Sequence, residues 1–184
     1  SSVVTASLPP AIAEWFERKG WRPREHQLGV LGSWQQGRSQ LLIAPTGAGK
    51  TLAGFLPTLS DLAEGGFEGL HTLYVSPLKA LAVDVQRNLN APIFEMGLKI
   101  SAETRTGDTP ASKRVRQRTK PPQILLTTPE QLALLISHPH AELMFGSLKR
   151  IVLDELHALV TSKRGELLSL ALARIAAHAP ALQI

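Results

Sequence analysis

The stretch that most constrains the fold runs from Leu41 to Thr51 and reads Leu-Leu-Ile-Ala-Pro-Thr-Gly-Ala-Gly-Lys-Thr. An apolar run, a glycine-punctuated turn and a Gly-Lys-Thr ending predict a strand, a phosphate-binding loop and the start of a helix. Gly47 and Gly49 permit backbone angles that turn successive N–H groups inward, which forms an anion cradle at a helix N-terminus. The stretch therefore predicts a local structure and a nucleotide-phosphate site together.

Within this loop, we expect Lys50 to reach the β- and γ-phosphates and the Thr51 hydroxyl to bind Mg²⁺. The general pattern has glycine four residues before Gly49, where this chain has Pro45. The alternative is a glycine-rich turn that binds nothing. The helix-compatible run after Thr51 favours the phosphate loop. The predicted nucleotide-binding residues of the loop are Thr46, Gly47, Ala48, Gly49, Lys50 and Thr51.

A second candidate motif, an acidic one, lies 104 residues after Lys50. There an apolar run ends in Asp154-Glu155-Leu156-His157. In phosphate-loop enzymes one carboxylate holds Mg²⁺ and the next orients and deprotonates the attacking water. We assign Asp154 to the metal and Glu155 to the water. The alternative is a carboxylate pair that caps the following segment, and His157 taken alone is a structural histidine.

Strands and helices alternate along the chain. Strands are predicted at 41–44, 72–75, 100–104, 124–127 and 151–153, with the beginning of another at 182–184, and helices at 12–16, 28–34, 52–63, 78–89, 110–119, 129–136 and about 165–178. We expect Pro57 to kink its helix, and Asp108 or Thr109 to cap the helix that begins at Pro110. This alternation predicts an α/β three-layer sandwich with a mainly parallel sheet, whose ligands bind at the carboxyl ends of the strands.

Composition excludes several classes of protein. The chain has 184 residues, which fits one domain, and no cysteine, so disulfides and thiolate zinc sites are excluded and a cytoplasmic location is expected. No signal peptide or membrane span is evident. The net charge of +5 is matched by the segment 105–120 alone. That segment indicates either a polyanion partner or a solvated helix face; its cations are Arg105, Lys113, Arg114, Arg116, Arg118 and Lys120.

Arg24 and Gln27 form a separate candidate site. An amide both donates and accepts hydrogen bonds, which suits the adenine edge, and a guanidinium can stack on the ring. The same residues also fit an ordinary helix N-terminus.

Five motifs in order now carry a resemblance: Ala-Pro-Thr-Gly-Ala-Gly-Lys-Thr, Ser-Pro-Leu-Lys-Ala-Leu, Arg-Thr-Gly-Asp-Thr, Thr-Thr-Pro-Glu-Gln-Leu and Asp-Glu-Leu-His-Ala-Leu. From about Leu8 to Ile184 the chain resembles superfamily 2 DExH-box helicases, more narrowly the large helicase-related (Lhr-type) group with the bacterial ligase-associated DEXH helicases. The resemblance implies a RecA-like P-loop NTPase with ATP and Mg²⁺ as cofactors, moving 3′ to 5′ on single-stranded nucleic acid, DNA favoured, in DNA repair.

The resemblance also implies roles for individual residues. Arg24 and Gln27 match the adenine-reading pattern, Lys50 and Glu155 the catalytic motifs, and His157 the residue that couples nucleotide state to strand binding. Backbone-contacting positions carry no base preference; they are Ser76, Pro77, Leu78, Lys79, Thr106, Gly107, Asp108, Thr128 and Pro129. Partners implied are a DNA-repair nuclease or ligase.

The family has a second RecA-like lobe with an arginine finger, which we expect beyond Ile184. We therefore interpret residues 1–184 as one N-terminal lobe, with a helical segment at 1–36 and a core at 37–184, able to bind ATP but not to unwind. A P-loop kinase of a small molecule and a non-enzymatic nucleotide-dependent binding module are the alternatives. The Asp154-Glu155-Leu156-His157 box argues against the kinase.

Overall fold

The computed structural model describes residues 8–18, 41–44, 48–155, 163–179 and 182, with the backbone alone for 41–44, 48–50 and 53. The elements are α2 (Pro10–Arg18), β1 (Leu41–Ala44), α4 (Ala48–Ala63), β2 (Thr72–Val75), α5 (Lys79–Glu95), β3 (Ala102–Arg105), α6 (Ala111–Thr119), β4 (Ile124–Thr127), α7 (Pro129–Ile136), α8 (Ala141–Phe145), β5 (Arg150–Asp154) and α9 (Lys163–His178). None of these described helices is long and apolar enough to cross a membrane.

The strands form a five-stranded sheet in the order β1-β5-β2-β4-β3, and each described pair is parallel. The predicted parallel sheet is thus confirmed. The last residues of neighbouring strands lie side by side: Ala44 beside Asp154, and Val75 beside Leu153 and Thr127. Every segment that follows a strand therefore starts from one edge of the sheet.

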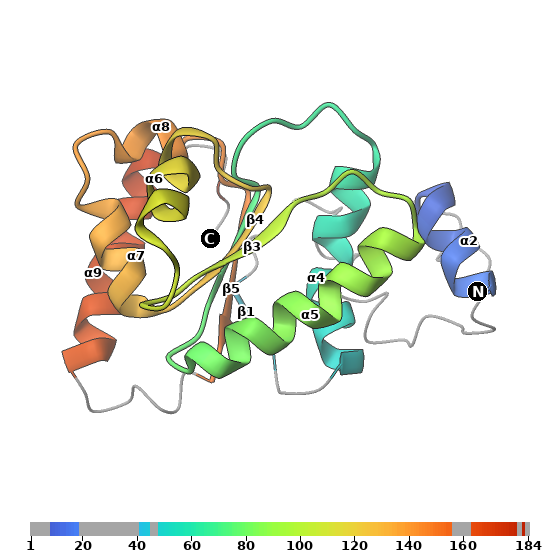
Figure 1. Ribbon diagram of the computed structural model, residues 1–184, viewed down its shortest axis with the longest axis horizontal. Coiled ribbons are helices and arrows are strands. Elements are labelled where there is room, and N and C mark those ends of the chain that lie inside the picture. Colours follow the sequence, from blue (N-terminus) through green and yellow to red (C-terminus); the bar gives the residue numbers. More distant parts are fainter. Residues whose placement is uncertain (1–7, 19–40, 45–47, 156–162, 180–181, 183–184) are drawn as a thin grey trace.

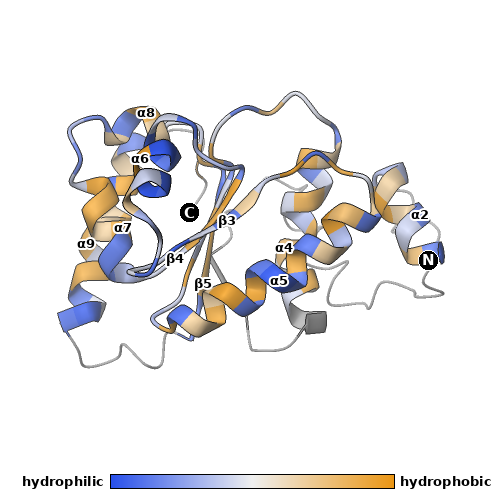
Figure 2. Ribbon diagram, in the orientation of Figure 1, coloured by the Kyte–Doolittle hydropathy of each residue, from blue (hydrophilic) through white to orange (hydrophobic). Residues whose placement is uncertain are grey.

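Helices cover both faces of the sheet, and Figure 1 shows α2, α4 and α5 on one side and α6 to α9 on the other. Strand residues alternate between the two cores. Tyr74 and Val152 belong to the core under α4 and α5, whereas Leu73 and Leu153 belong to the core with α7 and α9. Figure 2 shows the central strands as mostly hydrophobic, as expected for a sheet covered on both faces, whereas the edge strand β3 reads Ala-Glu-Thr-Arg. This confirms the predicted three-layer sandwich.

Element positions mostly agree with the sequence prediction. The strands at 72–75 and 124–127 match, and β3 begins two residues and ends one residue later than expected. The short helix α8 was not predicted. Leu78, expected as the first residue of the helix at 78–89, is the residue before α5 and is 47% exposed, and Leu170 within α9 is 65% exposed.

The predicted cap of α6 is wrong. Pro110 precedes the helix instead of opening it. The Thr109 hydroxyl accepts the N–H of Thr106 at 3.0 Å, and the Asp108 carboxylate forms an ion pair with Lys79. The side chains therefore stabilise the turn before α6. Helix α4 continues through Pro57. The helix predicted at 28–34 lies outside the described residues, and only Leu182 of the predicted strand at 182–184 is described, without strand structure.

Candidate functional site

The predicted phosphate loop and acidic box start from neighbouring strands. β1 ends at Ala44, which pairs in register with Asp154 at the end of β5, and α4 begins at Ala48. Gly49 and Lys50 lie in the first turn of α4, and Thr51, also in that turn, is buried. The backbone N–H groups at the start of a helix are free to bind an anion. Asp154 therefore lies at the same edge of the sheet as this N-terminus.

Asp154 is held by a tyrosine of the adjacent strand. The Tyr74 hydroxyl donates a hydrogen bond of 2.6 Å to Oδ2 of Asp154, and both side chains are buried. Burial raises the pKa of Tyr74, and the hydrogen bond to Asp154 and its charge raise it further, so the phenol stays a donor. Sequence reasoning missed this partner. The available signal was that the chain's single tyrosine lies in the strand before the Ser-Pro-Leu-Lys motif.

Glu155 has an unusual backbone. Its φ angle is 56°, and among the described residues it alone combines a positive φ with a side chain other than glycine's hydrogen. The left-handed region costs an ordinary residue about 1–2 kcal/mol, so such a conformation persists only where its surroundings enforce it. Strain of this kind concentrates at functional sites. The surroundings therefore hold the backbone of the half-buried Glu155 in this conformation, directly after β5.

The described side chains do not form a metal site made of protein ligands alone. Among the described side chains, no group of three or more His, Cys, Asp or Glu could hold a metal ion. Mg²⁺ usually keeps several waters and takes one or two protein oxygens together with substrate phosphates. One buried carboxylate and one threonine hydroxyl, Asp154 and Thr51, fit that second arrangement.

The predicted nucleic-acid segments follow β2, β3 and β4 at the same edge. Ser76 N–H donates to the Thr127 carbonyl at 3.1 Å, and the Thr127 hydroxyl donates to the Arg105 carbonyl at 2.7 Å. The starts of all three segments are thus tied to one another by hydrogen bonds. The structure brings together the segments that the sequence separates by up to about 50 residues.

Only some of the predicted nucleic-acid-contacting residues are exposed. The Ser76 hydroxyl accepts the N–H of Leu78 at 3.1 Å, and the Thr106 hydroxyl accepts the N–H of Asp108 at 3.2 Å. These hydroxyls build turns. The buried members are Ser76, Pro77, Thr106, Thr128 and Pro129, and the exposed members are Leu78, Lys79, Gly107 and Asp108. The Lys79 ammonium lies 2.8 Å from the Asp108 carboxylate, with both side chains more than half exposed.

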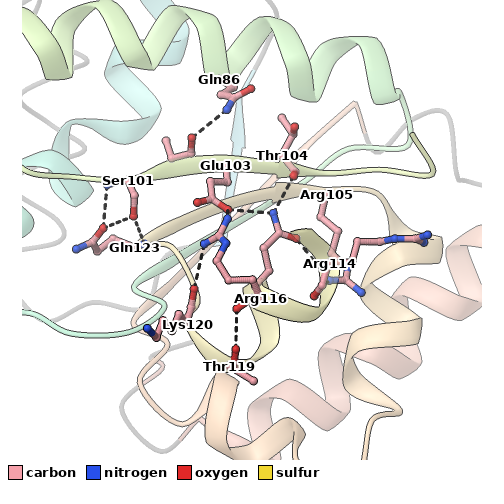
Figure 3. Close-up of polar contacts among 12 residues, drawn as sticks. Gln86, Ser101, Glu103, Thr104, Arg105, Arg114, Arg116, Thr119, Lys120 and Gln123 are labelled. Carbon is pink, nitrogen blue, oxygen red and sulfur yellow. Dashed lines mark hydrogen bonds and ion pairs between the residues drawn. The ribbon is translucent and has the colours of Figure 1, made fainter. Parts of the chain in front are cut away.

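Two cations of the basic segment 105–120, Arg105 and Arg116, are engaged with residues of β3 and α6 (Figure 3). Arg105 is 4% exposed and donates to the Arg114 carbonyl at 2.9 Å. Burial, with the charges of Arg118 and Arg114, lowers the pKa of Arg105 to about 10. Arg116 forms an ion pair with Glu103 at 2.5 Å. Arg105 is therefore no part of a polyanion-binding surface, contrary to the simple charge count.

A pocket of about 380 Å³ lies between α6, α7 and α8, lined among others by Val115, Arg118, Leu135 and Met144. It contains none of the predicted site residues. Of the sequence-predicted residues, Arg24, Gln27, Thr46, Gly47 and His157 lie outside the described part of the chain.

Comparison with known proteins agrees with this arrangement. The pattern of the DEAD/DEAH box helicase family matches residues 24–184. The chain is 36% identical to the ATP-dependent helicase Lhr-Core of Methanothermobacter thermautotrophicus, over 95% of this chain and 22% of that protein. It is 41% identical to the Lhr helicase/probable uracil glycosylase of Mycolicibacterium smegmatis, over 88% and 12%. The chain thus spans at most about a fifth of these relatives.

Solved structures show the same fold. The structure of Mycobacterium smegmatis helicase Lhr bound to ssDNA and AMP-PNP matches with a TM-score of 0.85 and 37% identity, over 98% of this chain and 25% of that one. The DEAD-box helicase Mss116 bound to ssRNA and UDP-BeF matches with a TM-score of 0.78 at 19% identity, which supports the fold alone. The predicted RecA-like fold is confirmed.

Proposed function

The chain belongs to the DEAD/DEAH box helicase family, and from that premise we propose that it is the ATP-binding lobe of an Lhr-type ATP-dependent helicase or translocase. The observation that carries the proposal is the register of β1 with β5, which sets the strand before the Gly-Lys-Thr turn beside Asp154. A nucleotide phosphate at the start of α4 would then meet both motifs. The relatives' names support ATP use, and the similar Lhr structure contains AMP-PNP.

Each residue of this edge has a distinct task in the proposal. The N–H groups at the start of α4 and the Lys50 ammonium bind phosphate oxygens, while Thr51 and Asp154 would hold Mg²⁺, which offsets negative charge on the phosphates. Glu155 accepts a proton from the attacking water. Tyr74 keeps the Asp154 carboxylate oriented. Arg24 and Gln27 would contact adenine, and His157 would relate nucleotide state to strand binding.

The strand-binding surface is the second half of the proposal. The exposed residues after β2 and β3, with the start of α7, would contact the sugar-phosphate backbone, without base preference. Single-stranded DNA is the favoured partner because the similar Lhr structure contains it. Movement from 3′ to 5′, a role in DNA repair beside a nuclease or ligase, a cytoplasmic location and a second RecA-like lobe complete the proposal.

Calorimetry with ATP and Mg²⁺ tests the nucleotide site. The parent chain should bind, Lys50→Ala should lose at least roughly tenfold in affinity because a charge-assisted contact is removed, and Lys79→Ala should bind like the parent. Equal affinity of Lys50→Ala and the parent would reject the site. A kinase would instead turn over a small phosphoacceptor in preference to responding to single-stranded DNA.

Salt dependence tests the strand-binding surface. With about three phosphates neutralised, the log–log slope of affinity for single-stranded DNA against salt should be about −2, from roughly −0.7 per contact. Lys79→Ala should weaken binding and reduce the slope by roughly 0.7. Arg116→Gln is the control, because Arg116 is already paired with Glu103. A flat salt response in the parent would remove Lys79 from the surface.

A further inference from the structure

Arg164, at the start of α9, contacts two segments that lie far from it in the sequence. Its Nη2 donates to the Pro77 carbonyl at 2.8 Å, 87 positions away. The same nitrogen donates to Oε2 of Glu130 at 3.1 Å, and Nε donates to Oε1 of Glu130, 34 positions away. One guanidinium thus joins the segment after β2 to the first turn of α7.

This geometry requires an arginine. The two parallel N–H···O bonds to one carboxylate use the planar fork of the guanidinium, and a donor remains for the Pro77 carbonyl. Burial by itself raises the pKa of Glu130, but the hydrogen bond and charge of Arg164, together with hydrogen bonds from the Glu130 backbone and the Thr128 side chain, bring the pKa below its ordinary value. A lysine ammonium is a point charge without the fork, so it cannot reproduce all three bonds in this arrangement.

The location of Arg164 relates two parts of the proposed machinery. Arg164 lies nine positions after Glu155 in the sequence, on the helix that follows the acidic box. Helices α7 and α9 pack in the same core, where Leu132 and Leu168 are both buried. A shift of the start of α9 therefore acts through one side chain on Pro77, a member of the proposed strand-binding set, and on Glu130, which directly follows Pro129 of that set.

The Arg164–Glu130 pair is not a strong stabilising contact. The Arg164 and Glu130 side chains are 40% and 45% exposed, and ion pairs at such exposure contribute little to folding. A residue that joins two segments of the proposed site and adds little to folding stability is suited to hold those segments at a fixed spacing.

We propose that Arg164 is a positioning residue that sets the spacing between the segment after β2 and the start of α7, so that Lys79 and the backbone at Thr128 and Pro129 form one strand-binding surface, and that it links this surface to the helix following the acidic box. The inference rests on the proposed function. It adds a residue that contacts neither nucleotide nor strand.

The test measures binding of a fluorescein-labelled dT₂₀ oligonucleotide by anisotropy to the 184-residue chain and its variants. Arg164→Gln should lower affinity at least roughly fivefold, the lower end of typical coupling between sites, with ATP affinity within twofold of the parent. Arg164→Lys should not restore the parent's affinity. Arg174→Gln is the matched control, because Arg174 is exposed on the same helix and the variant loses the same charge.

A double-mutant cycle with Glu130→Gln separates the pair from general charge effects. Removing both partners should cost less than the sum of the single losses. Thermal midpoints of all variants are measured alongside, so that any loss of binding is read below the transition.

Two results would overturn the inference in distinguishable ways. If the parent binds dT₂₀ and Arg164→Gln or Arg164→Lys binds equally well, Arg164 has no positioning role while the proposed surface stands. If the parent binds ATP but not dT₂₀ at low salt, the strand-binding half of the proposed function fails, and the inference fails with it.

Discussion

At the scale of single residues, two features distinguish the described part of the acidic box: the buried hydrogen bond between Tyr74 and Asp154 and the left-handed backbone of Glu155. Oδ2 of Asp154 accepts from a phenol that stays protonated, so the carboxylate has a defined orientation. Glu155 then leaves the strand with φ of 56°. The Asp154 side chain is thus oriented by a hydrogen-bond donor, whereas Glu155 is distinguished by its backbone conformation.

Tyr74→Phe removes the phenolic oxygen and leaves the ring, which lies 6.0 Å from Phe55 between centroids. We expect a loss of about 1.5–3 kcal/mol in the free energy of unfolding, the range for hydrogen bonds to charged groups, and a higher Mg²⁺ concentration for half-maximal ATP binding. Denaturant unfolding and a Mg²⁺ titration measure the two effects. Nucleotide affinity without Mg²⁺ should stay the same, and an unchanged Mg²⁺ midpoint would show that Tyr74 is merely a core residue.

Glu155→Ala and Glu155→Gly both remove the carboxylate and should both abolish hydrolysis. They differ in the backbone, because glycine adopts positive φ without the steric cost that alanine incurs. We expect Glu155→Gly to be at least as stable as Glu155→Ala, by up to about 1 kcal/mol, the reverse of their usual order. Chemical denaturation of both variants measures it. A clearly more stable alanine variant would mean that the left-handed conformation is not retained.

The sequence predicted Asp154 and Glu155 but not what holds them. An acidic pair at the end of an apolar run is a local pattern, so it can be read directly. The Tyr74 contact joins residues 80 positions apart and depends on the placement of β5 beside β2, which no local pattern reports. Arg164 was missed for the same reason.

At the scale of elements, a chain of polar side chains joins α4, β2 and β5 near the starts of the strands, away from the edge with the proposed site. The Asp61 carboxylate pairs with His71, whose other ring nitrogen lies 2.8 Å from the Thr72 hydroxyl. The Thr72 and Thr58 hydroxyls are 2.8 Å apart, and Arg150 donates to Thr58 at 3.1 Å. Burial lowers the pKa of Arg150 to about 10. These polar contacts join α4, β2 and β5 in addition to the apolar packing between them.

The Asp61–His71 pair predicts an acid-dependent loss of stability. The hydrogen bond from His71 lowers the pKa of Asp61 below 3.8, its ordinary value. A carboxyl with a lowered folded-state pKa stabilises the fold above its unfolded pKa, and this contribution disappears as pH falls through the folded pKa. We expect Asp61→Asn to cost up to about 1 kcal/mol near pH 6, in view of the exposure of Asp61, with the difference shrinking below about pH 4. Urea unfolding across pH measures it.

The control is Asp84→Asn, which removes an exposed carboxylate 3.9 Å from Arg87 on the same helix. Its stability difference should be near zero across the range. A constant Asp61→Asn difference at all pH values would contradict the role assigned to the carboxylate charge.

The two central strands with an apolar pattern were predictable, whereas the short helix α8 and the cap of α6 were not. The strands at 72–75 and 124–127 each hold three consecutive apolar or aromatic residues beside one threonine, and all of their positions are buried. Helix α8 has five residues, too few for a period to appear. The cap of α6 failed because Asp108 pairs with Lys79 from another segment, a tertiary contact that overrides the local preference of aspartate.

At the scale of the whole molecule, the strand order separates two tasks along one edge. β1 and β5 carry the proposed nucleotide residues, and β2, β4 and β3 are followed by the proposed strand-binding segments. The net charge of +5 does not by itself locate the proposed strand-binding surface, because Arg105 is buried and Arg116 is paired with Glu103. The charge count overestimated the exposed positive charge because it takes no account of burial or of ion pairs.

The last prediction concerns the chain by itself: it should bind ATP but hydrolyse it slowly. The ground state needs only the phosphate loop, Thr51, Asp154 and Glu155, which one lobe supplies in our proposal. The transition state places additional charge on the transferring phosphoryl group, and an arginine that stabilises it contributes about 10³ to 10⁵ in rate. Among the described arginines near the edge, Arg164 is committed to Glu130 and Pro77 and is not available for that role.

Steady-state ATPase with saturating single-stranded DNA measures this on the 184-residue chain and on a chain extended to the length of its relatives. We expect turnover in the short chain to be lower by at least roughly 10³, and Glu155→Gln to abolish it in the long chain. Equal turnover in both would place a stabilising arginine within residues 1–184 or on a second copy. Dependence of the short chain's turnover on protein concentration would then separate those two, since only a second copy acts by association.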